Sequence, residues 1–364
     1  MAAVPEARTG LPPDGAAAEQ RYPVEFAGDA GEYFRIWIVN LALTIITLGI
    51  YSAWAKVRKK RYFYANTLIG GEAFEYRGNP IAILKGRIIA VALLAVYGVA
   101  GQLSPLVQLG VGLAFAIAFP WLLVRSLAFN AYNSAYRNIR FHFSGKYADA
   151  LKMLALSALL VIVTLGIAYP YARARLAKFS ADYHRYGTAQ FALPGLTGTF
   201  YGIYLRLIGL VLLIGLAFAL AVALVGFAAA AAGIDPRGAG FRGLMLVVGP
   251  VGALAFYLLV FAYPRARIGN AIWNHLSIGT TQVRFESRLR VRDLLGLYVV
   301  NILAIALTLG LATPWAVIRT LRYRAQKTAL LVAGGLDQFV SAQAADIGAA
   351  GEEVGEMFGF DFGF

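Results

Sequence analysis

The stretch Thr47-Leu48-Gly49-Ile50-Tyr51-Ser52-Ala53-Trp54-Ala55-Lys56-Val57-Arg58 decides how this chain is organised. An apolar segment ends at Thr-Leu-Gly, and an aromatic residue and a basic helix follow it. The same pattern returns after Thr164-Leu165-Gly166 and after Thr308-Leu309-Gly310, with aromatic and basic residues at the same spacing. Self-similarity of this kind within one chain predicts internal structural repeats.

Two further copies of the pattern lie around Trp121 and after Pro264, so we expect the module five times. In each copy an apolar segment ends at a small residue or proline, and a basic, aromatic helix follows. A short Phe-x-aromatic-x-Gly segment often closes the module, most clearly at Phe74–Gly78 and Phe141–Gly145, and Val24–Gly28 fits the same place before the first apolar segment. Alternation of this kind predicts a half-buried strand.

Composition indicates a membrane protein. Of the 364 residues, 59% are hydrophobic and 14% are charged, whereas soluble domains are about 45–50% apolar and about 25% charged. Several apolar segments approach or exceed the roughly 20 residues that cross a bilayer. The seven segments are Ile36–Trp54, Ile88–Leu103, Val107–Val124, Met153–Tyr171, Leu207–Ala232, Leu244–Tyr263 and Leu294–Ile318.

The expected fold class is therefore an all-α polytopic membrane protein with internal repeats. We allow for a small β-sheet on the cytoplasmic side, formed from the Phe-x-aromatic-x-Gly segments. The predicted divisions are a disordered leader without signal-peptide character (1–22), repeat unit 1 (23–140), repeat unit 2 (141–284), a partial third repeat (285–330) and an acidic tail (331–364).

Two topologies are open. If all seven segments cross, Lys and Arg divide almost evenly between the two sides, which the positive-inside rule disfavours, although inverted repeats are typical of secondary transporters. If segments 36–54, 153–171 and 294–318 bend at Thr-Leu-Gly and return, only Arg237 and Arg242 lie outside. Charge favours the second arrangement, and the short distance from Gly49 to Lys56 counts against it.

The net charge of +14 indicates an anionic partner. The basic residues flank the apolar segments, so we expect a bilayer with anionic headgroups rather than nucleic acid. The sequence leaves the oligomeric state open, and a homo-oligomer is compatible with it.

The residues give no support for catalysis. The chain has no cysteine, and His142, His184 and His275 lack a metal-ligand spacing. There is no phosphate-binding Gly-x-x-x-x-Gly-Lys-Ser/Thr loop and no acid within the apolar segments. We therefore expect no enzyme activity, no metal and no cofactor.

Four arginines stand one helical turn after the aromatic residue in corresponding copies. They could anchor the helices at the headgroup level, or converge on an anionic ligand or lipid headgroup, because guanidinium binds phosphate bidentately. These candidates are Arg58, Arg125, Arg175 and Arg319.

Three polar residues occupy corresponding places within apolar segments: Asn40, Ser157 and Asn301. Interhelical hydrogen bonding is one interpretation, and a place in a transport path is the other. Two functions therefore stay open. One is transport of a small anionic solute, and the other is a membrane scaffold or anionic-lipid-binding protein without transport.

The pattern resembles the YjgN-like bacterial inner-membrane proteins, a family of unknown function. The resemblance rests on residues 47–58, Arg61-Tyr62, Asn66-Thr67 and Phe74-Glu75-Tyr76, and it covers the chain from about Val24 onward. It implies a multi-pass protein of the bacterial inner membrane and carries over no functional residue. The copy after Pro264 departs from the pattern, because Gly269 takes the arginine position.

Overall fold

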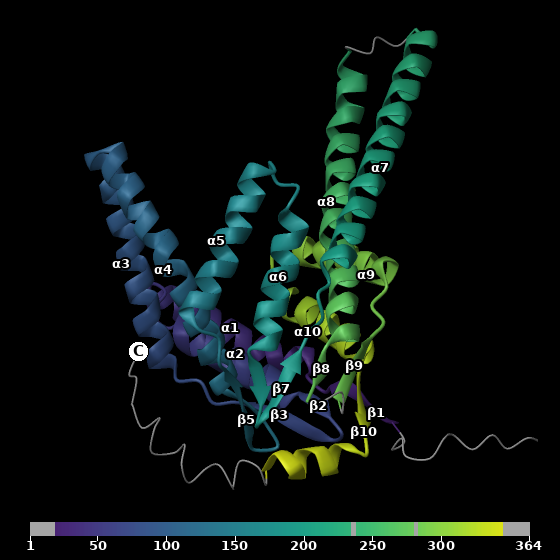
Figure 1. Ribbon diagram of the computed structural model, residues 1–364. Helices are drawn as coiled ribbons and strands as arrows, with labels where there is room; N and C mark the ends of the chain where they lie inside the picture. The colour runs from purple at the N-terminus through teal and green to yellow at the C-terminus, as the bar shows by residue number, and fades with distance from the viewer. Residues whose placement is uncertain (1–18, 234–237, 280–282, 345–364) are drawn as a thin grey trace, which may run out of the picture.

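The computed structural model describes residues 19–233, 238–279 and 283–344. Within these ranges the chain runs five times through the order strand, helix, helix, strand, so that each pair of helices forms a hairpin held between two strands (Figure 1). The hairpins are α1 Ala30–Ile46 with α2 Ser52–Ala65, α3 Pro80–Leu103 with α4 Pro105–Tyr132, α5 Tyr147–Val163 with α6 Tyr169–Asp182, α7 Thr197–Ala231 with α8 Ala239–His275, and α9 Val291–Leu307 with α10 Thr313–Gln326.

The strands form one closed antiparallel barrel. Its order is β1-β10-β9-β8-β7-β6-β5-β4-β3-β2, and β2 pairs with β1. Different parts of β1 pair with different strands: residues 19–23 pair with β10, and residues 24–26 pair with β2. The strands are β1 Glu19–Phe26, β2 Thr67–Ile69, β3 Glu72–Tyr76, β4 Ser134–Tyr136, β5 Ile139–Phe143, β6 His184–Tyr186, β7 Ala189–Ala192, β8 Ser277–Ile278, β9 Val283–Ser287 and β10 Thr328–Ala333.

The expected all-α fold class is wrong, because this barrel is a complete closed sheet and not a small accessory one. The Phe-x-aromatic-x-Gly segments supply only the strands that enter the hairpins. The strands that leave them are two to six residues long, and β4 and β6 consist of Ser-Ala-Tyr and His-Arg-Tyr. Such short segments carry no periodic signal, yet each pairs with strands on both sides and thereby completes the ring.

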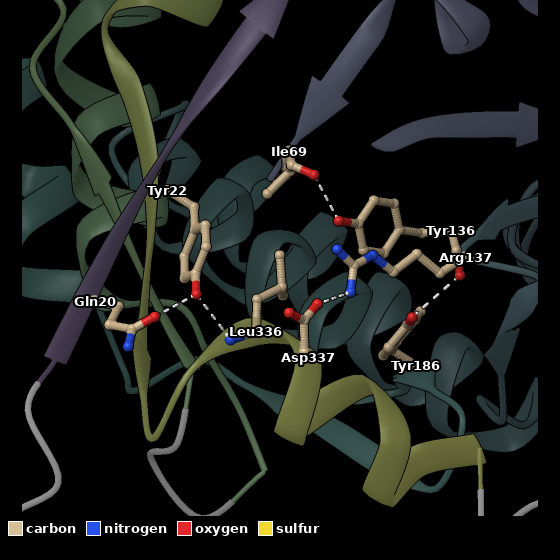
Figure 2. Close-up of polar contacts among 8 residues, drawn as sticks. All are labelled: Gln20, Tyr22, Ile69, Tyr136, Arg137, Tyr186, Leu336 and Asp337. Atoms are coloured by element: carbon tan, nitrogen blue, oxygen red, sulfur yellow. Dashed lines mark hydrogen bonds and ion pairs between the residues drawn. The ribbon is translucent and has the colours of Figure 1, made fainter. Parts of the chain in front are cut away.

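The inside of the barrel is a packed hydrophobic core. Tyr136 and Tyr186 are buried there with Val283 and Val332, and aromatic rings of neighbouring strands pack against them. Tyr136 donates a hydrogen bond to the carbonyl of Ile69 (2.6 Å), and Tyr186 donates to the carbonyl of Tyr136 (3.1 Å), as Figure 2 shows. The buried hydroxyls are thus paired with backbone oxygens.

A helix of residues 336–344 lies against this core. Leu336, Phe339 and Val340 belong to it, and the backbone N–H of Leu336 donates to the hydroxyl of Tyr22 (3.1 Å). Asp337 forms an ion pair with Arg137 (Figure 2). The helix following β10 is therefore part of the barrel core.

The predicted leader and tail extend partly into this structure. β1 begins at Glu19, and β10 and the helix 336–344 occupy the first part of the predicted acidic tail. The remaining leader and tail residues lie outside the described ranges. The division into repeat units at 140/141 and 284/285 falls inside β5 and β9 and stays a prediction.

The glycine that ends each Phe-x-aromatic-x-Gly segment makes room for the aromatic ring two residues before it. A Cβ at Gly28 would lie 2.6 Å from the ring of Phe26, and one at Gly78 would lie 2.5 Å from the ring of Tyr76. The aromatic side chain folds over the glycine where the strand gives way to the helix. This packing explains why an aromatic residue and a glycine recur at that spacing.

Neighbouring hairpins pack around the barrel, and the ring closes between the last and the first. Ile318 and Ala325 of α10 share a buried cluster with Tyr33 of α1 and Tyr62 of α2. The Nη2 group of Arg322 also donates to the carbonyl of Gly28 (3.0 Å). The first and last hairpins are therefore as firmly joined as hairpins that follow one another in sequence.

Candidate functional site

Two hairpins are long and apolar. In the described part of the chain four helices are long and apolar enough to cross a membrane, namely Pro80–Leu103, Pro105–Tyr132, Thr197–Ala231 and Val248–His275, and their apolar side chains are largely exposed. Figure 1 shows α7 and α8 rising well beyond the α5–α6 hairpin. Within the described residues, Arg242 is the only basic residue at the far end of these hairpins.

The other three hairpins are short, and two of them carry a cleft between their helices. The cleft between α9 and α10 has a volume of about 550 Å³ and is lined by Asp293, Arg319, Arg322 and Tyr323, among others. The guanidinium of Arg319 lies 5.1 Å from the ring centre of Trp315, and its Nη1 lies 3.4 Å from Oδ1 of Asn301. Two basic groups and one acid therefore line the same open cleft.

The cleft between α5 and α6 has a volume of about 300 Å³ and repeats this arrangement. Asp149, Arg175 and Lys178 take the places of Asp293, Arg319 and Arg322. The guanidinium of Arg175 lies 5.5 Å from the ring centre of Tyr171, whose hydroxyl accepts a hydrogen bond from Nε (3.1 Å). Lys178 forms an ion pair with Asp182 (2.7 Å), and Lys152 adds a further base to the lining, so both clefts have more basic than acidic side chains.

Tyr323 closes the α9–α10 cleft at the end where α9 begins. Its hydroxyl accepts from the backbone N–H of Arg290 (3.1 Å) and donates to Oδ2 of Asp293 (3.2 Å). In the first hairpin the hydroxyl of Tyr62 accepts in the same way from the backbone N–H of Asp29 (2.9 Å). The second helix of these hairpins thus holds the start of the first helix.

The four predicted arginines lie on the second helices of four different hairpins: Arg58 on α2, Arg125 on α4, Arg175 on α6 and Arg319 on α10. Arg175 and Arg319 line the two separate clefts, so the four do not share one convergent site. Arg125 lies over the ring of Trp121, at 5.6 Å from its centre. Stacking on the aromatic residue one turn earlier is the feature that three of them share.

Asn40, Ser157 and Asn301 are buried on the first helices of three different hairpins. The Nδ2 group of Asn301 donates to the carbonyl of Ala316 (3.2 Å) and to Oγ1 of Thr320 (3.1 Å), both on α10. Oδ1 of Asn40 and Oγ of Ser157 have no hydrogen-bond partner among the described residues. The three residues therefore do not form one polar path.

Lys178 and Arg322 are cleft residues that the sequence argument did not single out. Both stand at the place of Arg61 in the first copy, so the repeat itself carried the signal. Asn66 and Asn133 end α2 and α4, and their side chains donate to the carbonyls of Tyr62 and Phe129.

Two histidines lie on neighbouring barrel strands below the α5–α6 hairpin. Burial, helped by the charges of Arg140 and Arg185, lowers the pKa of His142 below its usual range. Burial also lowers the pKa of His184, against the opposing effect of the Ser180 carbonyl. In the described part of the chain no group of three or more His, Cys, Asp or Glu side chains could hold a metal ion.

The chain matches, over residues 21–357, the family described as "Bacterial protein of unknown function (DUF898)". The chain belongs to this family. Inner membrane protein YjgN of Salmonella typhimurium (strain LT2) is 26% identical over 86% of this chain and 88% of that protein. The proteins of the same name from Escherichia coli O157:H7 and Escherichia coli K12 are 32% and 33% identical, over 33% of this chain and 30% of each relative. No solved structure matches the chain.

This membership of the DUF898 family confirms the resemblance to YjgN-like proteins. The relatives are named inner membrane proteins, and the four apolar helices fit association with a membrane.

Proposed function

We propose that this chain is a bacterial inner-membrane protein that binds anionic lipid headgroups and acts as a scaffold without transporting a solute. The observation that carries the proposal is the pair of matching clefts, in which Arg175 and Arg319 stack on aromatic rings next to a second basic residue. A stacked guanidinium is held in place, and the N–H groups that are not bonded to Tyr171 or Asn301 stay available for phosphate.

A transport function has less support. Asn40, Ser157 and Asn301 lie in separate hairpins, and the barrel interior is filled by aromatic and aliphatic side chains. A transporter needs one enclosed site that both sides of the membrane reach in turn. The clefts instead open between the helices of individual hairpins.

The proposal includes four crossings and a cytoplasmic barrel. α3, α4, α7 and α8 cross, and the ends of every hairpin return to the barrel, where nearly all basic residues lie. The positive-inside rule then places the barrel in the cytoplasm. We also infer that the five strand-helix-helix-strand units are internal repeats of one ancestral unit.

Cysteine labelling tests this topology, because the chain has no cysteine of its own. Ser104→Cys and Gly238→Cys lie at the far ends of the long hairpins, and Ser341→Cys lies on the helix beside the barrel. An impermeant maleimide added to intact cells should label the first two and leave the third unlabelled. Labelling at 341 but not at 104 would invert the orientation.

Headgroup binding is tested with Arg175→Gln/Arg319→Gln in nanodiscs of phosphatidylethanolamine with a fluorescent phosphatidylglycerol. Charge-assisted hydrogen bonds contribute about 1.5–3 kcal/mol, so retention of the anionic lipid should fall by roughly tenfold or more. Arg242→Gln, which removes a charge at the far end of α8, is the matched control. Unchanged retention in the double variant, or uptake of an anionic solute by proteoliposomes, would count against the proposal.

A further inference from the structure

The three short hairpins end in one and the same turn. At the tip of the first, the N–H of Gly49 donates to the carbonyl of Thr44 (2.7 Å) and the N–H of Leu48 donates to that of Ile45 (3.1 Å). This pair of bonds is the helix-ending Schellman arrangement. Gly166 with Leu165 and Gly310 with Leu309 form the same two bonds.

The residue at the left-handed position of this turn is a leucine, although a leucine side chain disfavours that backbone conformation. Leu48, Leu165 and Leu309 have φ angles of 51°, 49° and 50°, in the left-handed region. Glycine is the usual residue at this position, because a Cβ disfavours the conformation. The chain instead places a branched, bulky side chain at this position in all three tips.

These leucines do not pack against the protein. Their exposed fractions are 95%, 94% and 95%. The residues around each tip are also apolar and exposed, including Ile46, Ile50, Ile167 and Leu307. A strained and fully exposed leucine gains nothing in water, so its surroundings must be apolar for the choice to be favourable.

The aromatic and basic residues that follow each tip indicate how deeply the tip lies in the bilayer. Trp54, Tyr171 and Trp315 follow the turn, and Arg58, Arg175 and Arg319 stand one turn further along the second helix. Arg58 is six residues after Ser52, the start of α2, which is about 9 Å of helix. With the arginine among the phosphates and the aromatic ring at the interface, the tip lies about 10 Å below the phosphates, in the upper acyl-chain region of a leaflet that is about 20 Å deep with its headgroups.

We infer that Leu48, Leu165 and Leu309 are three hydrophobic anchors that insert into the hydrocarbon of the leaflet on the barrel side. The four long helices place a bilayer on this side of the barrel, and the apolar tips project into it. The short hairpins enter one leaflet from the same face and do not cross. The occupant of this surface is lipid acyl chain.

The first test measures depth directly. Single cysteines at 48, 165 and 309 are labelled with an environment-sensitive fluorophore in proteoliposomes, and lipids with a quenching doxyl group high or low on the acyl chain are compared. We expect quenching about threefold stronger than at Ser341→Cys, and strongest for the shallow doxyl group. Quenching no stronger than at position 341 would overturn the inference.

The tips could also contact a second copy of the chain. In that case the fluorophore signal at position 48 would depend on protein density in the bilayer and not on the doxyl lipid. That result would overturn the inference as well. Both outcomes leave the headgroup test at Arg175 and Arg319 unaffected, so the two proposals fail separately.

The second test uses the strain itself. Leu48→Gly removes both the strain and the anchor, so thermal unfolding in detergent should be unchanged or shifted upward. In proteoliposomes the same change should reduce the quenching of a fluorophore at Ile50→Cys by about twofold, and Leu48→Asp should reduce it further. If Leu48→Gly lowers the unfolding temperature and leaves quenching intact, the leucine has a structural role and the inference is wrong.

Discussion

The long and the short hairpins share the order strand, helix, helix, strand, and they differ in how far their tips extend from the barrel. The second helices of the short hairpins have 14 residues each, about 21 Å, and fall short of a bilayer core of about 30 Å. α3 has 24 residues and α8 has 37, so both can cross. In the topology that we propose, one supersecondary unit serves two relations to a bilayer, and hairpin length decides between them.

The tips differ in chemistry as well. Ser104 joins α3 to α4 directly, and its side chain accepts from the N–H of Leu106 (3.2 Å), which satisfies a free group at the start of α4. The short hairpins instead turn through a leucine in the left-handed region. The polar turn suits the far headgroup region, and the apolar turn suits hydrocarbon.

The largest expected effect comes from a charge in a long hairpin. Leu216→Arg lies near the middle of the apolar part of α7, where a charged residue costs about 2.5–3.5 kcal/mol of insertion free energy. External labelling of Gly238→Cys should therefore fall at least about tenfold. Ala232→Arg, at the end of the helix, is the control and should have little effect.

The same substitution in a short hairpin sharpens the contrast. Leu159→Arg in α5 should cost less than Leu216→Arg, because a helix that ends inside one leaflet lets arginine reach the headgroups. Yield of folded protein from membranes measures the two costs. An equal loss would indicate that α5 crosses fully.

The next largest expected effect is a change in stability when buried polar residues of the short hairpins are replaced. Asn301→Leu removes the bonds to Ala316 and Thr320 and should lower stability by about 1 kcal/mol. Asn40→Leu removes an oxygen without a partner and should be neutral or stabilising. Thermal unfolding in detergent compares the two, and loss of solute uptake in both would indicate a transport path instead.

A smaller difference separates the short hairpins from one another. Tyr323→Phe removes the hydroxyl that binds Arg290 and Asp293, and we expect a loss of about 1 kcal/mol. The α5–α6 hairpin already has Phe179 at this place, so Phe179→Leu leaves the hydroxyl count unchanged and serves as a packing control. Hydrogen exchange at the start of α9 reports the local effect, which should be absent at α5.

The smallest effect is a dependence on pH. His142 and His184 have lowered pKa values in the folded barrel, so the unfolded chain binds protons more readily than the folded one. Their contribution to stability is complete above the ordinary histidine pKa of about 6.5 and is lost as pH falls toward the folded values. The hydrogen-exchange protection of β5 and β6, corrected for the pH dependence of intrinsic amide exchange, should therefore fall on acidification while that of α7 and α8 does not change. His142→Gln/His184→Gln should remove the difference.

The sequence predicted the parts of the fold that have a long or repeated signal. The apolar lengths of α3, α4, α7 and α8 and the recurring Thr-Leu-Gly turns were visible in it. The closed barrel was not, because β8 has two residues and its identity depends on β7 and β9 beside it. The sequence predicted only part of each cleft. Arg175 and Arg319 were candidates because of the aromatic residue one turn earlier, whereas Lys178 and Arg322 resembled ordinary basic residues of a helix.

The seam between β1 and β10 has a consequence for how the molecule is made. The residues that pair there, such as Gln20 with Val332, lie far apart in the sequence, so β1 is synthesised long before β10. The four long helices are complete before β10 exists, so membrane insertion precedes closure of the ring. Until β10 is made, β1 and β9 present open edges on which other chains can pair. A ring assembled in this order makes β10 a checkpoint for the closure of the barrel.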